Sequence, residues 1–156
     1  MHKHKNIVIF RAIAVLLAIA LFLPVNANAA TGETAQPYES SYLRSYNAYV
    51  HCAGSGNIQV WFTVRGTNIM DELGTLTIQL YESSDNLTWS WVKSYTNDSS
   101  PSMLGYNDYV HEGYVSYTGV VGRYYKAYVC VWAGKDGDGD SRFFWTSSQK
   151  ATLFAG

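Results

Sequence analysis

The stretch at residues 113–147 reads GYVSYTGVVGRYYKAYVCVWAGKDGDGDSRFFWTS and alternates apolar segments with glycine-rich bends. Its longest apolar segment, residues 123–133, is rich in the β-branched and aromatic residues that favour strands. Glycine at the bends supplies backbone angles that β-branched residues cannot take. The stretch therefore predicts strand, turn, strand, loop and strand, with residues 134–140 as the loop.

Period-two alternation predicts further strands before this stretch. In the clearest of them, residues 58–64, the apolar side chains fall on every second position. We expect seven strands, near residues 42–53, 58–64, 76–80, 88–96, 109–117, 123–133 and 142–153, with connections at 66–74 and 97–108. Short strands separated by evenly spaced turns are typical of two packed sheets. The sequence thus predicts an all-β fold, a single immunoglobulin-like β-sandwich of about seven antiparallel strands over residues 42–156.

The first 29 residues have the three parts of a cleaved secretory signal. Basic residues precede an apolar run at 12–23, and Ala27 and Ala29 occupy the small-residue cleavage positions. The run is shorter than the roughly 20 residues that span a bilayer, which disfavours the alternative of a membrane anchor. We expect a signal peptide at 1–29, a poorly ordered leader at 30–41, and a secreted, extracellular product.

Charge narrows the classes of partner. Three of the 11 basic residues, Lys3, Lys5 and Arg11, lie in the predicted signal, whereas all 12 acidic residues follow it. The exported part therefore carries a formal charge of about −4, which argues against a nucleic acid or an anionic membrane. We expect one domain, a monomer, with no membrane contact after cleavage.

Both cysteines of the chain, Cys52 and Cys130, fall in the exported part. An even count in an oxidising compartment favours a disulfide, and two separate thiols are the alternative. The order Cys52, Trp61, Cys130 and the tyrosine at Tyr128 also match an immunoglobulin core. Against that core, Cys130 alternates with the aliphatic residues of its strand, so a bridge would join neighbouring strands rather than the two sheets.

Several short motifs together resemble a group of small secreted proteins of Gram-positive bacteria whose function is uncharacterised. The motifs are MDELG at 70–74, LYE at 80–82, WVKSY at 91–95, MLGY at 103–106, GRYY at 122–125, KDG at 135–137 and DSR at 140–142. The resemblance covers most of the exported part. It implies an exported β-rich domain and brings no catalytic residues with it, and paired cysteines are not part of its pattern.

Asp136, Asp138 and Asp140 alternate with glycines, as in the first half of a calcium-binding loop. A helix-flanked calcium loop would then need glycine after the third aspartate and a bidentate glutamate near its end, and serines stand at both positions, Ser141 and Ser147. The same alternation suits a solvent-exposed hairpin. We expect a hairpin without a metal, and no cofactor.

Asp71 and Glu72 lie in one predicted loop, and Arg142 follows another. These three side chains could form an ion pair at one end of the fold. The alternative is three separately solvated charges, and an exposed pair would contribute only about 0–1 kcal/mol.

Catalytic motifs are missing from the sequence. The exported part has only two histidines, His51 and His111, and neither a Gly-x-Ser-x-Gly nor a His-Glu-x-x-His motif. A pair of carboxylates drawn from distant strands would leave no local motif, so a small secreted hydrolase remains an alternative. A bacteriocin-like effector is a third class.

The 13 tyrosines and five tryptophans are the remaining compositional signal. Exposed aromatic rings stack on sugars and pack in protein interfaces, while rings inside a core serve only stability. Trp89 and Trp91 are two residues apart in one predicted strand and would project from the same face. We therefore expect a secreted binding domain for a glycan, cell-wall polymer or protein surface, with Trp89 and Trp91 as its contact residues.

Overall fold

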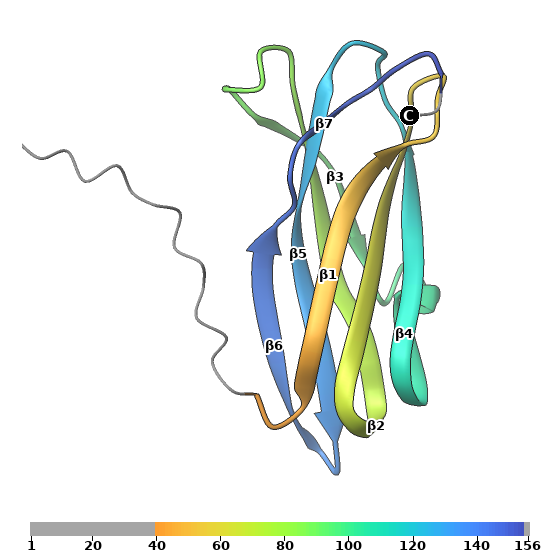
Figure 1. The fold of residues 1–156 in the computed structure, drawn as a ribbon, viewed down its shortest axis with the longest axis vertical. Coiled ribbons are helices and arrows are strands. Elements are labelled where there is room, and N and C mark those ends of the chain that lie inside the picture. Colours follow the sequence, from red (N-terminus) through yellow and green to blue (C-terminus); the bar gives the residue numbers. More distant parts are fainter. Residues whose placement is uncertain (1–39, 155–156) are drawn as a thin grey trace, which may run out of the picture. The chain divides into compact units, whose positions relative to one another are not determined.

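The structure is a computed structural model and describes residues 40–154, so the predicted signal and most of the leader lie outside the described residues. The described chain is all-β (Figure 1). Its elements are β1 (Leu43–Cys52), β2 (Asn57–Ser83), β3 (Ser90–Thr96), the 3-10 turn η1 (Pro101–Met103), β4 (Leu104–Thr118), β5 (Tyr124–Lys135), β6 (Asp138–Trp145) and β7 (Gln149–Lys150). Within residues 40–154 no helix is long and apolar enough to cross a membrane.

Strand β2 organises the sheet because it has neighbours on both sides along most of its 27 residues. Its first part, residues 57–66, pairs with β1 on one side and with β4 on the other. Its last part, residues 77–83, lies between β3 and β5, and β5 in turn pairs with β6 and β7. All pairings are antiparallel and together make one seven-stranded sheet.

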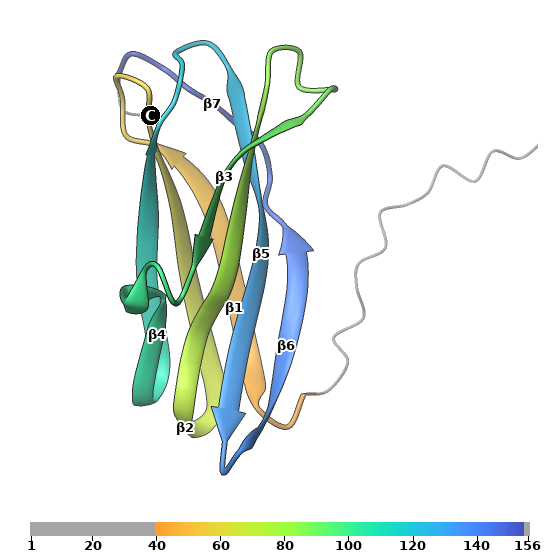
Figure 2. The same ribbon diagram turned by 180° about the vertical axis from the view of Figure 1, so that it is seen from behind.

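The sheet curls because β2 and β4 turn together at one end of the molecule (Figures 1 and 2). Their register shifts between Arg65 and Met70, after which Met70–Gly74 pairs with Leu104–Asp108. A Cβ at Gly66 would lie 2.6 Å from Met70 Cγ, so the bend depends on a residue without a side chain. The prediction of antiparallel all-β structure is confirmed. The structure does not confirm a sandwich of two sheets, because one continuous curled sheet supplies both layers.

The core lies inside this curl. It collects the inward residues of both parts of β2 and of β5, which are 0–2% exposed: Ile58, Val60, Phe62, Val64, Ile78, Leu80, Tyr125, Ala127, Val129 and Val131. Their strict alternation with less buried positions is the period-two pattern of a sheet with one face in the core.

Tyrosines bridge the two edges at which the curled sheet is not closed by strand pairing. On one edge, the Tyr46 ring lies 5.2 Å from the Phe144 ring, joining β1 to β6. On the other edge, the Tyr95 hydroxyl donates to the Ser116 carbonyl at 2.6 Å, joining β3 to β4. Part of the tyrosine content therefore serves to hold edge strands together.

The turn between β5 and β6 is shorter than the predicted loop at 134–140. Lys135 pairs with Asp138, which leaves only Asp136 and Gly137 in the turn. Their φ angles of 55° and 83° are those of a two-residue primed turn, for which Asp-Gly is a favoured sequence. The predicted hairpin is confirmed, while the loop prediction was wrong because both strands continue to the turn.

The predicted disulfide does not form: both cysteines, which lie within the described residues, are free thiols. Cys52 is part of the core cluster, whereas Cys130 lies between the core residues Val129 and Val131 and so faces the other side of the sheet. Both are buried, and burial raises the pKa of each thiol. The disulfide predicted from the even cysteine count was therefore wrong.

Candidate functional site

Aromatic side chains gather on the outer face of the sheet formed by β3, the second part of β2, β5 and β6, the side of the molecule seen in Figure 2. Trp91 pairs across the strands with Tyr81, and Tyr128 pairs with Trp145. The Trp145 ring lies 5.1 Å from the Tyr81 ring and 4.9 Å from the Tyr128 ring. We call this set, completed by the Phe143 ring 5.8 Å from Tyr128, the outer aromatic face.

The outer aromatic face is open to solvent. Trp91 is 59% exposed, Phe143 58% and Trp145 48%. The strands place these side chains outward because their chain neighbours Val92 and Phe144 pack against the core. The exposure is therefore a consequence of the same alternation that builds the core.

Lys126 contacts two indole rings, those of Trp89 and Trp145. Its Nζ lies 4.3 Å from the centre of the Trp89 ring and 4.4 Å from that of Trp145. A cation at this distance over an indole is attracted by the negative face of the ring. Lys126 therefore links the chain before β3 to β6 across β2 and β5.

The two tryptophans predicted as contact residues have different surroundings. Trp91 lies on β3 and is exposed, and its Nε1 donates to Ser94 Oγ at 3.1 Å. Trp89 precedes β3, is half-buried, and has its ring beneath Lys126. Trp91 thus offers a free ring surface, while Trp89 serves to position its neighbours.

Trp61 lies on the outer face of the other part of the sheet. It pairs with Tyr49 on β1 and with Tyr114 on β4, and its ring stacks on Tyr114 at 4.5 Å. The order Cys52, Trp61, Cys130 does not correspond to an immunoglobulin core: as the alternation around Cys130 indicated, neither a Cys52–Cys130 bridge nor a buried Trp61 is present among the described residues.

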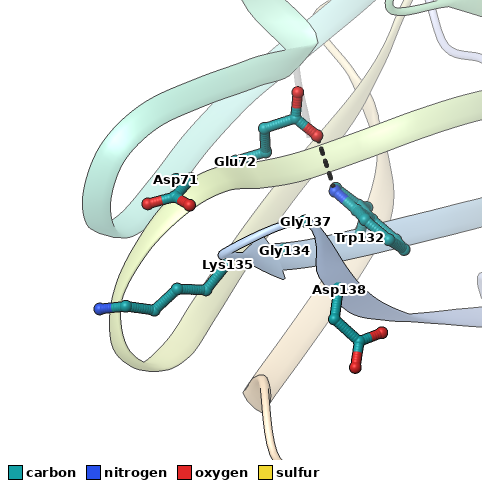
Figure 3. A pocket seen from close by; sticks show the side chains of 7 residues that line it. All are labelled: Asp71, Glu72, Trp132, Gly134, Lys135, Gly137 and Asp138. Carbon is teal, nitrogen blue, oxygen red and sulfur yellow. Dashed lines mark hydrogen bonds between the residues drawn. The ribbon is translucent and has the colours of Figure 1, made fainter.

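A pocket of about 280 Å³ opens where the bend of β2 meets the turn between β5 and β6 (Figure 3). Its lining is acidic and aromatic: Asp71, Glu72, Trp132, Gly134, Lys135, Gly137 and Asp138. The Trp132 indole Nε1 donates to Glu72 Oε2 at 3.1 Å. Trp132 belongs to the outer side of β5, like Tyr128, and lies toward the opposite end of the strand from Lys126.

The predicted ion-pair residues have other partners. Asp71 Oδ2 accepts the backbone N–H of Asp136 at 2.7 Å, and Glu72 accepts from Trp132. Arg142 forms its ion pair with Asp140 instead. Burial by itself would raise the pKa of Asp140, but hydrogen bonds from Ser40 and Arg142 outweigh it and hold that pKa below its ordinary value.

The three aspartates of the Gly-Asp repeat diverge in the structure. Asp136 occupies the turn, Asp138 accepts the Tyr42 hydroxyl at 3.0 Å, and Asp140 pairs with Arg142. Residues 40–154 contain no cluster of three His, Cys, Asp or Glu side chains able to hold a metal ion. The carboxylates of the hairpin therefore do not converge on one point.

No model of a known protein family matches this chain, and no curated protein matches it significantly in sequence.

Sequence reasoning singled out Trp91 but missed Tyr128, Phe143, Trp145 and Trp132. The outward direction of Tyr128 and Trp132 follows from alternation with Val129 and Val131 on β5, and that of Phe143 and Trp145 from alternation with Phe144 on β6. Their grouping with Trp91 depends on the cross-strand register, which no local pattern reveals.

Proposed function

We propose that this protein is a secreted binding domain that holds an extracellular glycan, such as a cell-wall polymer, against the outer aromatic face. The observation that carries the proposal is the set of rings across four strands, with the exposed Trp91 at one edge on β3 and the exposed Trp145 and Phe143 at the other on β6. Export rests on the predicted signal at residues 1–29.

The chemistry of the face suits sugars. The C–H faces of pyranose rings stack on indole and phenol rings, and aromatic side chains supply this area with little loss of rotamer entropy. Neighbouring strands are about 4.8 Å apart, so rings on β3, β2, β5 and β6 form a track long enough for several sugar units. A polymer would therefore gain from several weak contacts at once.

Polar side chains lie among the rings and favour a glycan over a protein surface. Gln79 pairs with Tyr128 and accepts the Tyr81 hydroxyl at 3.3 Å, and Ser94 accepts from Trp91. Interfaces with proteins are instead marked by an apolar, fully desolvated centre. Rings interspersed with amide and hydroxyl groups match the alternating C–H and O–H surface of a sugar.

The test is a sedimentation assay with purified cell-wall sacculi, chitin and cellulose. We expect the protein without its signal to bind at least one of these polymers. Trp91→Ala and Trp145→Ala should each lose most of the binding, because stacking on one ring contributes about 1 kcal/mol or more. Tyr49→Ala serves as the matched control, since Tyr49 is 49% exposed and lies on the other part of the sheet.

Two results would overturn the proposal. One is equal loss of binding in Tyr49→Ala and Trp91→Ala. The other is the absence of binding to every polymer together with capture of a specific protein through Trp91, which would assign the face to a protein partner. Unfolding curves of each variant separate lost contacts from lost structure.

A further inference from the structure

We infer that the pocket at Trp132 is a second binding site, independent of the outer aromatic face, and that it takes an alkylammonium group. The pocket joins residues far apart in sequence: Asp71 and Glu72 from the bend of β2, and Trp132, Lys135 and Asp138 from β5 and β6. Neither the glycan proposal nor the stability of the core requires it.

The net negative charge of the pocket favours a positively charged ligand. The lining includes three carboxylates, those of Asp71, Glu72 and Asp138, and a single ammonium, that of Lys135. Lys135 Nζ donates to the Ile69 carbonyl at 3.1 Å and extends away from the indole (Figure 3). Within residues 40–154 none of the three carboxylates makes an ion pair, and with one ammonium against three carboxylates the pocket keeps a net negative charge.

Each of these carboxylates is instead positioned by a neutral donor. Asp71 accepts a backbone N–H, Glu72 accepts the indole N–H, and Asp138 accepts the hydroxyl of Tyr42. A neutral donor orients a carboxylate without cancelling its charge. The carboxylates are therefore held in place and remain available to a positive ligand.

The indole of Trp132 lies flat against the sheet and forms one wall of the pocket. It rests on Gly134 and Gly139, which are paired across β5 and β6. A Cβ at Gly134 would lie 2.8 Å from Trp132 Cζ2, and a Cβ at Gly139 would lie 2.4 Å from Trp132 Cη2. The ring can occupy this position only because both residues are glycines.

The hydrogen bond from the Trp132 indole to Glu72 strengthens the attraction between the ring and a cation. A carboxylate that accepts the indole N–H polarises the ring and increases the negative character of its face, where a cation is attracted. An alkylammonium group would thus meet an indole face with the Glu72 carboxylate at its edge, in a pocket of net negative charge. Its alkyl chain would fill the remaining volume of the pocket.

A divalent metal ion fits the same residues poorly. Such an ion needs several oxygens converging at about 2.0–2.6 Å. Figure 3 shows the carboxylates of Asp71, Glu72 and Asp138 directed to different sides, with only Glu72 turned to the indole. A spread of negative charge beside an aromatic wall suits an organic cation better than a small hard ion.

The ammonium group could belong to a free diamine or to a lysine side chain of a peptide. Two probes separate these sources: cadaverine for the free amine, and Nα-acetyl-lysine N-methylamide for the side chain. The neutral isostere 1,5-pentanediol reports any binding that does not depend on charge. Binding is followed by the ¹⁵N–¹H resonance of the Trp132 indole, assigned by its loss in Trp132→Phe.

We expect one or both amines to shift the Trp132 resonance saturably, with the other four indoles unaffected, and the diol to leave it unchanged. Glu72→Gln keeps an acceptor for the indole N–H but removes one charge, and should weaken binding by about three- to tenfold. Asp98→Asn removes an exposed charge outside the pocket and should leave the affinity unchanged. Added salt should weaken binding in the wild-type protein.

The inference is overturned if neither amine gives a saturable shift, if the diol gives the same shift, or if Asp98→Asn weakens binding as much as Glu72→Gln. If Glu72→Gln fails to fold, the salt dependence and the diol control still test, in the wild-type protein, whether binding depends on the charge of the amine. Loss of glycan binding in Trp91→Ala leaves this site intact, so the two proposals succeed or fail separately.

Discussion

Cys52 and Cys130 lie on opposite faces of the same curled sheet. Cys52 packs in the core beside Val50, while Cys130 is paired with Thr77 and Phe143 on the outer side. Both are 3% exposed. A bridge between them would require one strand to turn over, which would move its entire core face into solvent.

We therefore expect two free thiols in the protein after purification without reductant. In the native state they should react slowly with a thiol reagent at pH 8, because burial both shields the sulfur atoms and raises their pKa. In denaturant both should react at once. A reducing agent should leave the melting temperature unchanged, and two unreactive cysteines in denaturant would contradict the structure.

Replacement of Lys126 should reveal the contact that joins Trp89 to Trp145. We expect Lys126→Met, which keeps the alkyl chain but removes the cation, to lower the free energy of unfolding by about 1 kcal/mol. Lys150→Met is the control, because its Nζ lies 5.3 Å from the single ring of Tyr124. Urea unfolding measures both variants, and an equal loss in the two would refute a special role for Lys126.

Tyr125 carries a buried hydroxyl group whose removal should be costly. Its ring is 0% exposed, and its hydroxyl donates to Glu82 at 3.1 Å and accepts the Val120 N–H at 2.8 Å. We expect Tyr125→Phe to destabilise the fold by about 1–3 kcal/mol, because the Val120 N–H and the Glu82 carboxylate lose their hydrogen-bond partner.

The neighbouring residue provides the control for this experiment. Tyr124 is half-buried on the opposite side of β5, and Tyr124→Phe should change the free energy of unfolding by less than about 0.5 kcal/mol. Comparable losses in the two variants would show that the hydroxyl of Tyr125 is not specifically required.

Asp85 should contribute to stability in a pH-dependent way. Its Oδ1 accepts the N–H groups of Leu87 and Thr88 at 2.8 Å, and these bonds, with the Ser83 hydroxyl, lower its pKa well below the ordinary value. A lowered folded-state pKa means that the stabilisation is complete above the unfolded pKa of about 4 and is lost as the pH falls further.

We therefore expect Asp85→Asn to be less stable than wild type by a constant amount above about pH 5, with the difference shrinking below about pH 4. Asp98→Asn removes the charge of an exposed aspartate that accepts no such hydrogen bonds among residues 40–154, and it is the control. Chemical unfolding between pH 2 and 7 checks this, and a difference that grows on acidification would refute the assignment.

The parts of the fold that could be predicted are those determined by local alternation. The strand around Ile58 and Val60 and the long strand around Val129 were recognised because each buries one face, and that face shows in the sequence. The continuity of β2 through Gly66 and Gly74 could not be recognised. Its hydrogen bonds go to β4 and β5, which lie far along the chain, and glycines ordinarily indicate a loop.

The candidate sites likewise combine features that local alternation reveals with features that depend on distant strand pairing. The outward direction of Trp91 followed from its strand, whereas its place beside Tyr81 and Trp145 depends on the register of β2 with β3 and β5. For the pocket, Gly134 and Gly139 looked like loop residues, although their role is to make room for Trp132. Such a role appears only when the cross-strand partner of each glycine is known.

The position of β2 has a consequence for how the native protein opens. Edge strands β1 and β6 each have one hydrogen-bonded neighbour in the described sheet, whereas β2 is paired on both sides. Opening of either edge, where tyrosines replace strand pairing, leaves β2 bonded on at least one side. Those amides of β2 that donate to β5, which is itself paired on both sides, should therefore exchange with deuterium chiefly through global unfolding, while those of β1 and β6 exchange through local fraying. The pairing between β2 and β5 is in this sense the last part of the sheet to open.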